Sequence, residues 1–243
     1  MDITKYAILK KLAGGGGGSG DHADEDAIVS GTITNYTNDR VTSIGDYRFY
    51  RCASLTSVDL PAVTSIGDFA IDGCSNLTSA NLPAVTSIGT YAFAYCSNLT
   101  SANLPAVTSI GTYAFRDCSN LTSANLPAVT SIGNAVFYFC TRLTSANLPA
   151  VTSIETSAFQ GCLELTSLIL RVTTQVCTLS NTSAFNNTPI KSGTGYIYVP
   201  AALINSYKTA TNWTTYANQF RALESYTVDG TTTGELDPTK VNA

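Results

Sequence analysis

The chain has 243 residues, 44% of them hydrophobic and only 12% charged, which suffices for one sizeable core but leaves solubility to hydroxyl and amide side chains. Its net charge of −4 offers no basic surface to phosphates, so we expect no nucleic-acid partner. No stretch reaches the roughly 18 apolar residues that a bilayer requires, so we expect no membrane insertion.

Residues 1–13 predict a short amphipathic helix, Ile3–Ala13, with lysines beside its apolar positions. About three helical turns are marginal alone in water, so we expect this helix to dock on another protein or to self-associate, although a disordered extension fits equally well. No apolar run of seven or more precedes a small-residue cleavage site, so no N-terminal signal peptide is evident.

Residues 14–26 predict a Gly-rich, acidic linker. Gly14–Gly18 has neither the preceding strand nor the following Lys-Ser/Thr of a phosphate-binding loop, so it is expected to be a flexible tether. The only histidine, His22, lies among acidic residues that could attract a divalent cation weakly, but a solvated linker fits better because a calcium loop needs other spacings. A lone histidine in a mobile linker is a poor general base. We therefore expect no enzyme activity, catalytic residue, cofactor or metal site.

A period of 22 residues dominates the rest of the chain, and one unit reads LTSANLPAVTSIGTYAFAYCSN. A half-repeat from Val41 precedes the array, and Ala27–Asn35 alternates like a strand that could cover its first coil. Because one unit cannot bury its apolar side alone, the copies must stack, and we expect a solenoid with its N-terminal cap over residues 27–190. Units begin at Leu55, Leu77, Leu99, Leu121 and Leu143, with a diverging start at Leu165.

Within one unit, Leu99, Ala102 and Leu104 point inward from a short strand, which Pro105 ends. The chain then turns back across a second face, with Gly111 as a flexible corner. Stacking at about 4.8 Å predicts one short parallel strand per coil and ladders of identical side chains inside.

Six cysteines recur once per coil, a spacing that stacks neighbouring thiols rather than converging four ligands on one zinc ion. We expect structural thiols, although neighbouring positions remain within disulfide range. Cys177 lies outside the register and is the cysteine most expected to be free. The six in register are Cys52, Cys74, Cys96, Cys118, Cys140 and Cys162.

The repeat resembles the BspA-like (Treponema-type) leucine-rich repeat over about residues 41–180. The resemblance implies an α/β-type solenoid, a right-handed leucine-rich-repeat superhelix that binds other molecules. Alanine at positions such as Ala80 and Ala102 replaces the usual larger aliphatic residue, which implies a slightly thinner coil. The residues that carry the pattern in one unit are Leu77, Leu82, Pro83, Val85, Ile88, Ala92, Phe93, Cys96 and Leu99.

After the array, Leu165–Leu170 and Gly195–Pro200 read as strands. Two short helices should follow, Pro200–Thr209 and Asn212–Leu223, the second capped by Asn212. We therefore expect a C-terminal cap of one strand and helices over 191–225 and a flexible tail over 226–243.

The segment YIYVPAALINSYKTATNWTTYANQFRALE resembles the capping element of BspA-like arrays in virion proteins of phages that infect Gram-positive bacteria, and both termini resemble the flanks of phage tail-associated proteins. This resemblance implies a phage tail or virion component. A bacterial cell-surface adhesin is the alternative, so the expected location is a virion or the cell surface.

The positions that change between copies are the two residues before each repeat cysteine and a second pair after the Ile-Gly corner. Stacking should place them in one strip of tyrosine, phenylalanine and arginine, residue types enriched in binding hot spots. The expected partner is a protein or a surface glycan, although packing of these rings against the coil is an equally good explanation. The candidate binding residues are Tyr47, Tyr50, Arg51, Tyr91, Tyr95, Tyr113, Arg116, Asp117, Tyr138 and Phe139.

The opposite flank repeats a Ser-x-Asn pattern, as at Ser101 and Asn103. Such a uniform ladder of hydroxyls and amides could bind a glycan, but a solvated sheet face explains it better.

Overall fold

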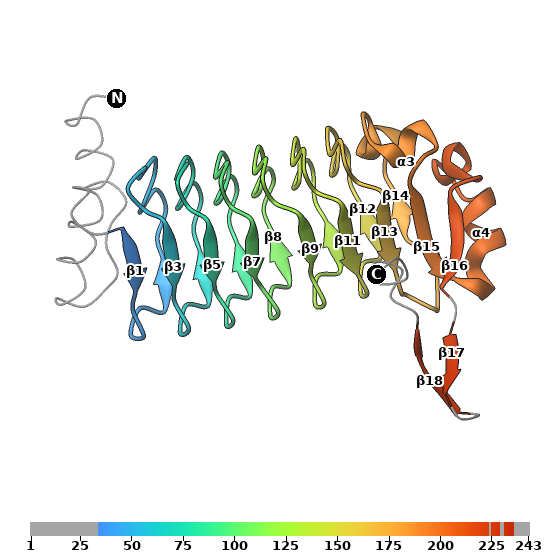
Figure 1. The fold of residues 1–243 in the computed structure, drawn as a ribbon, viewed down its shortest axis with the longest axis horizontal. Coiled ribbons are helices and arrows are strands. Elements are labelled where there is room, and N and C mark those ends of the chain that lie inside the picture. The colour runs from blue at the N-terminus through green and yellow to red at the C-terminus, as the bar shows by residue number, and fades with distance from the viewer. Residues whose placement is uncertain (1–33, 224, 229–230, 236–243) are drawn as a thin grey trace.

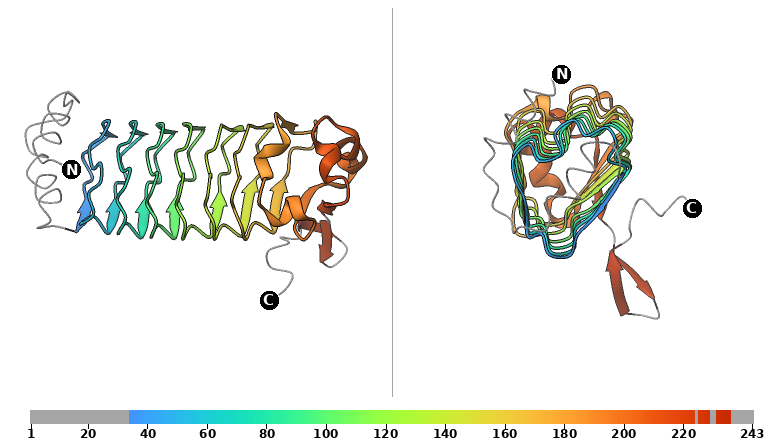
Figure 2. Two further views of the ribbon diagram at one scale, coloured as in Figure 1. Left: turned by 90° about the horizontal axis from the view of Figure 1, so that it is seen from above. Right: turned by 90° about the vertical axis from the view of Figure 1, so that its left-hand side faces the viewer.

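The computed structural model describes residues 34–223, 225–228 and 231–235, in which successive coils stack into an elongated body (Figure 1). Viewed along the stack, the coil outlines superpose (Figure 2, right). The expected helix Ile3–Ala13, the linker 14–26 and most of the expected cap strand lie outside the described residues. We number the coils in chain order: coil 1 ends at Ser54, and coils 2 to 7 begin at Leu55, Leu77, Leu99, Leu121, Leu143 and Leu165.

The first flank of the stack is a parallel sheet with one strand per coil, as the repeat predicts. Within the array, most residues of these strands pair with the residue 22 positions later, for example Ser79 with Ser101. The inward residues of these strands are buried, except the half-buried Ala102, and the outward serines and asparagines are mostly exposed. The strands are β1 (Asn35–Thr37), β3 (Ser57–Asp59), β5 (Ser79–Asn81), β7 (Ser101–Asn103), β9 (Ser123–Asn125), β11 (Ser145–Leu148) and β13 (Ser167–Leu170).

A second, two-residue strand in each coil adds to the single strand that the sequence predicts. It forms where the Ser-Ile dipeptides of successive coils lie side by side, with the serine mostly exposed and the isoleucine buried. A dipeptide is too short to show alternation, so the sequence pattern could not reveal it. These strands are β2 (Ser43–Ile44), β4 (Ser65–Ile66), β6 (Ser87–Ile88), β8 (Ser109–Ile110), β10 (Ser131–Ile132), β12 (Ser153–Ile154) and β14 (Thr178–Leu179).

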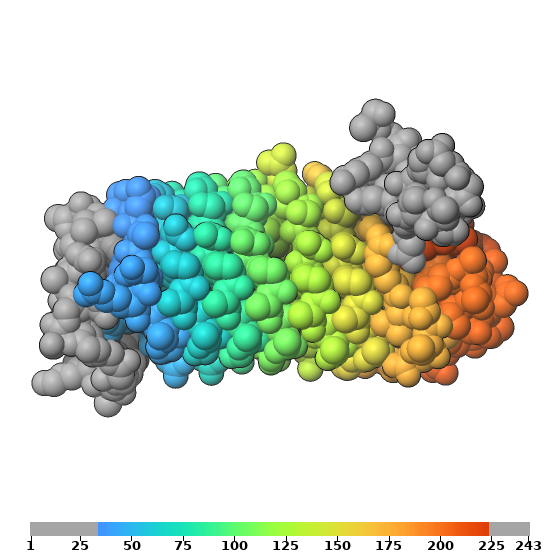
Figure 3. Space-filling view, turned by 90° about the horizontal axis from the view of Figure 1, so that it is seen from below, coloured from blue at the N-terminus to red at the C-terminus, as the bar shows by residue number. Residues whose placement is uncertain are grey.

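Ladders of like residues fill the interior. The clearest is a column of phenylalanines whose rings stack at centroid distances of 5.2 to 5.7 Å from Phe93 to Phe185. Threonines form hydrogen bonds between coils at the coil edges. For example, both the backbone amide and the hydroxyl of Thr78 donate to the carbonyl of Thr56. Each coil is therefore held to its neighbour by packing inside and by hydrogen bonds at its rim. The space-filling view shows the coils as parallel bands across the body (Figure 3).

Aromatic side chains close the C-terminal end of the stack. Trp213 donates its indole N–H to the carbonyl of Cys177 at 2.6 Å, and Tyr207 accepts the amide of the same residue at 3.0 Å. The Tyr216 hydroxyl donates to the carbonyl of Thr182 at 2.7 Å. The elements of this cap are η1 (Thr182–Phe185), α3 (Pro189–Ser192), β15 (Tyr196–Pro200), η2 (Ala201–Leu203), α4 (Ile204–Thr209), η3 (Trp213–Tyr216) and β16 (Phe220–Leu223).

The predicted helix Asn212–Leu223 is wrong. The chain forms only the single turn η3 and then β16, which pairs with the free edge of β15. The apolar spacing from Trp213 to Leu223 fits both arrangements, and pairing with β15 satisfies backbone groups that a helix would leave uncovered at the sheet edge. Asn212 does not cap a helix: its amide donates to the carbonyls of Leu179 and Ser180.

The expected tail, residues 226–243, contains most of an antiparallel hairpin instead. Strand β17 (Ser225–Val228) pairs with β18 (Thr231–Glu235), with an irregularity in register near Tyr226. The β-branched residues of this segment favour extended backbone, which the high threonine content already indicates.

Candidate functional site

Two positions in each of coils 1 to 6 have positive φ, and both are among the positions that vary between copies. Most of the residues at these positions are not glycine, although the left-handed conformation costs a non-glycine residue roughly 1–2 kcal/mol. Gly73 and Gly161 show that the fold accepts glycine at the second position. The larger side chains are thus not required by the backbone, which points to a role for the surface they create. The non-glycine residues are Tyr47, Arg51, Phe69, Tyr91, Tyr95, Tyr113, Asp117, Ala135, Phe139 and Ser157.

The first of these positions forms an outer column of four stacked rings. Tyr47, Phe69, Tyr91 and Tyr113 lie 4.9, 5.0 and 4.8 Å apart, centroid to centroid. Coil 5 has the small Ala135 at this position, and the ring of Tyr138 meets the end of the column edge-on at 6.0 Å. Most ring faces in the column are therefore covered by neighbouring rings.

Arg116 lies at the centre of the strip. Its guanidinium carbon is 5.3 Å from the ring centroid of Tyr95 and 5.4 Å from those of Tyr113 and Tyr138. Its Nε donates to the carboxylate of Asp117 at 3.0 Å. The cation thus joins rings from three successive coils. Contacts of this kind hold an otherwise flexible arginine in one orientation, as interface hot spots require.

Glycine at the second position of coils 2 and 6 makes room for the large residue of the coil before it. A Cβ on Gly73 would lie 2.8 Å from Arg51 Cγ, and one on Gly161 would lie 2.9 Å from the Phe139 ring. Arg51 and Phe139 therefore lie against the backbone of the following coil, in space that a side chain there would occupy.

Asp72 is the one charged side chain buried in the strip, with 6% of its surface exposed. Its Oδ1 has no hydrogen-bond partner. Burial raises the pKa of this carboxyl to about 6, although Arg51 and Arg116 partly oppose that shift. A carboxylate held this way destabilises the fold at neutral pH. Asp72 is absent from the candidate residues because its burial depends on the neighbouring coils. The only indication in the sequence is a single acidic residue at a repeat position where the other copies carry different residue types.

The ten candidate residues do line one strip on the turn side of the stack. Arg51 and Tyr95 are exposed, and Tyr95 shows 44% of its surface. The other eight are half-buried, and several of them, such as Tyr91 and Tyr113, also pack against a ring of a neighbouring coil. Binding surface and packing are thus not exclusive here. The strip, as used below, comprises these ten residues with Phe69 and Asp72.

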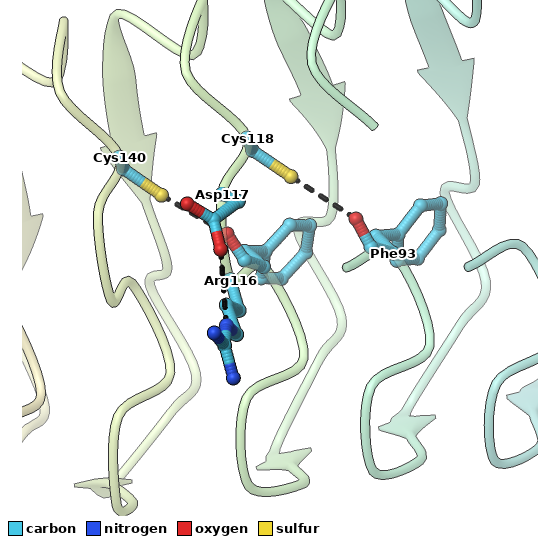
Figure 4. Close-up of polar contacts among 6 residues, drawn as sticks. Phe93, Arg116, Asp117, Cys118 and Cys140 are labelled. Carbon is cyan, nitrogen blue, oxygen red and sulfur yellow. Dashed lines mark hydrogen bonds and ion pairs between the residues drawn. The ribbon is translucent and has the colours of Figure 1, made fainter. Parts of the chain in front are cut away.

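The repeat cysteines are buried free thiols. From coil 2 onward each donates its S–H to a backbone carbonyl of the preceding coil, as Cys118 does to Phe93 at 3.1 Å and Cys140 to Phe115 at 3.0 Å (Figure 4). Cys177 is also buried. Within the described part of the chain, no group of three histidine, cysteine, aspartate or glutamate side chains could hold a metal ion.

Six of these thiols, all except Cys52, are expected to resist modification. Burial raises the pKa of Cys177 to about 12 and those of Cys74, Cys96, Cys118, Cys140 and Cys162 still further. Because the thiolate is the reactive form, labelling by an aromatic disulfide at pH 8 should be slower by about a thousandfold than in urea. Fast labelling of the native protein, or disulfides after mild oxidation, would contradict this.

The opposite flank offers fewer free groups than its sequence suggests. Asn103 donates its amide to Asn81 and Asn147 to Asn125, both at 2.9 Å. These amides are occupied along the ladder, which favours a solvated face over a glycan site. A shallow depression of about 220 Å³ over β9, β11 and β13 is lined by Ser123, Ala124, Asn125, Ser145, Asn147, Ile169 and Arg171.

Among the residues with described structure, no helix has the length and apolar character needed to span a bilayer.

Comparison with known proteins extends these observations. The family model for the BspA type leucine-rich repeat region matches residues 31–128 and 86–199, together well over half of the chain. A leucine-rich cell surface protein of Faecalibacterium prausnitzii A2-165 is 31% identical with a TM-score of 0.60, covering 69% of this chain and 48% of its own. The chain thus spans about half the length of that protein. The leucine-rich repeat protein of T. pallidum is 28% identical with a TM-score of 0.56, covering 72% and 75%. No curated protein matches significantly.

Proposed function

The chain belongs to the BspA-type leucine-rich repeat family, and from this premise we propose that it is a non-enzymatic binding protein whose strip docks a protein partner. The observation that carries the proposal is the strained backbone at Arg51, Tyr95 and Phe139, a position where Gly73 and Gly161 show that glycine also fits. Backbone strain of this kind collects at functional sites.

A protein partner suits the strip better than a glycan. Sugars stack on open aromatic faces, whereas most ring faces in the outer column are covered at 4.8 to 5.0 Å. Beside this column the hydroxyl-bearing ring of Tyr95 is exposed, and the Arg116 guanidinium lies 5.3 Å from its centroid. Such mixed apolar and hydrogen-bonding surface is typical of protein interfaces.

We propose the bacterial cell surface as the place of action, because the F. prausnitzii neighbour is described as a cell surface protein. A phage tail or virion component remains a second proposal, which rests on the sequence of the C-terminal cap and termini. Gene neighbours separate the two: tail and lysis genes beside this one would favour the virion, and surface or export genes would favour the adhesin.

Alanine at Tyr95 or Tyr138 is expected to weaken partner binding by at least about tenfold each, because both rings contact Arg116 at the centre of the strip. The partner would first be found by parallel screens of surface proteins and glycans, and affinities then measured by biolayer interferometry.

Tyr196→Ala is the matched control, since Tyr196 also stacks on an arginine, Arg221 at 4.1 Å, but lies outside the strip. It should leave affinity unchanged. Equal loss in all three variants, or a glycan ligand indifferent to both strip variants, would contradict the proposal.

A further inference from the structure

Both sheets of the solenoid are interrupted at one junction, between coils 4 and 5. Strand β7 does not pair with β9, and β8 does not pair with β10, although every other described coil junction from coil 1 to coil 7 keeps both pairings. The backbone amides of Thr100, Thr108 and Gly111 bond to coil 3, at 3.0, 2.9 and 2.8 Å. No such bond is formed by the equivalent amides of coil 5, those of Thr122, Thr130 and Gly133.

The spacing of the coils widens at the same place. A Cβ on Gly111 would lie 2.5 Å from the backbone of coil 3, whereas one on Gly133 would lie 3.6 Å from its nearest neighbour, the carbonyl oxygen of Ile110. Ala102 is half-buried, although Ala80 and Ala146 are buried at the same position. The left view in Figure 2 shows the wider gap between the coil of β7 and the coil of β9.

The strands themselves do not explain the interruption, because coils 3, 4 and 5 share the sequence LTSANLPAVTSIG. The difference lies beyond the corner, where Val136 occupies a buried column that is alanine in the coils on either side, Ala114 and Ala158. A Val136 methyl carbon lies 3.8 Å from the Cβ position of Gly133. Two extra methyl groups in a close-packed column need additional room, and the corner of coil 5 is in contact with them.

The turn side of the same junction stays bonded. The amides of Tyr113, Phe115 and Asp117 donate to coil 5 at 3.3, 2.9 and 2.8 Å, and the phenylalanine column continues. Arg116 also bridges the junction, through its contacts with Tyr113 and Tyr138. The junction is therefore open along both sheets and closed along the strip.

We propose that this junction is a hinge set by Val136, about which coils 1–4 and coils 5–8 bend, the coil of β15 being coil 8. The strip side acts as the axis, because its bonds survive, while the two sheet flanks open and close. Opening the flanks curves the strip inward across Arg116. A partner that wraps the strip would thus favour one bend angle over others.

Hydrogen exchange of the full chain, measured by NMR, tests the open flank. The amides of Thr122, Thr130 and Gly133 are expected to exchange at least about a hundredfold faster than those of Thr100, Thr108 and Gly111. Val136→Ala should slow the first three at least about tenfold. The matched variant Ala92→Val places the same wedge in coil 3 and should speed exchange at Thr78, Thr86 and Gly89. No effect of either variant would overturn the proposal.

Spin labels distinguish a hinge from a fixed gap. Labels at Ser57→Cys and Ser145→Cys lie on the flank four coils apart, roughly 20 Å, on either side of the junction. Their distance distribution is expected to narrow at least about twofold when Val136→Ala restores the pairing. Equal widths with and without Val136 would mean a static separation and would also overturn the hinge.

Discussion

Phe115→Ala is expected to lower the free energy of unfolding by about 3 to 5 kcal/mol, the largest effect of any single substitution considered for this protein. Phe115 is 1% exposed and stacks on Phe93 at 5.2 Å and on Phe137 at 5.6 Å. Its removal leaves a cavity between two rings in a column that cannot collapse without shifting both neighbouring coils. Urea denaturation followed by circular dichroism measures the loss.

Tyr113→Ala is the control for this prediction. Tyr113 is two residues away and also stacks on a ring of the preceding coil, at 4.8 Å, but it is half-buried on the outer column. This substitution should lower the free energy of unfolding by only about 1 kcal/mol, since Tyr113 stabilises the fold mainly through ring contact rather than through burial. Similar losses in both variants would mean that inner and outer columns contribute equally, contrary to the structure.

Asp72→Asn is expected to remove a pH dependence of stability. With a folded pKa of about 6 against 3.8 for the free group, Asp72 binds its proton more tightly in the folded state. Its contribution is therefore most favourable below about pH 4 and is lost as pH rises through 6. Relative to the variant, the wild type should lose about 2 to 3 kcal/mol between pH 4 and pH 8.

Urea unfolding of both proteins at several pH values checks this difference. Asp59→Asn, a change at an exposed carboxylate of the first flank, should alter stability by less than about 0.5 kcal/mol throughout. A wild-type and Asp72→Asn difference that stays constant with pH would show that the buried carboxylate is solvated or paired.

The repeat made the stacked columns predictable, because a period of 22 fixes which residues meet. Leu99 and Leu104 are buried where expected, and the variable positions do form one strip. The opening at coil 5 was not predictable in this way. Val136 is a conservative change from alanine in sequence, and its effect depends on how little space separates two corners.

The backbone conformation of the strip could not be predicted from the sequence either. Comparison of the copies shows that the positions of Tyr95 and Asp117 vary. It does not show that both residues have positive φ, since only glycine indicates this conformation in a sequence. The C-terminal cap was mispredicted because Trp213, Tyr216 and Phe220 are spaced for a helix, and only the free edge of β15 makes a strand preferable for the last part.

The exact 22-residue register has an evolutionary consequence. Because an internal coil contacts only the coil before and the coil after it, and both present the same columns, a whole unit such as residues 77–98 can be duplicated or deleted without redesigning the interior. Each such event lengthens or shortens the proposed docking surface by one row. Array length is therefore a trait that selection can adjust separately from the residues of the strip.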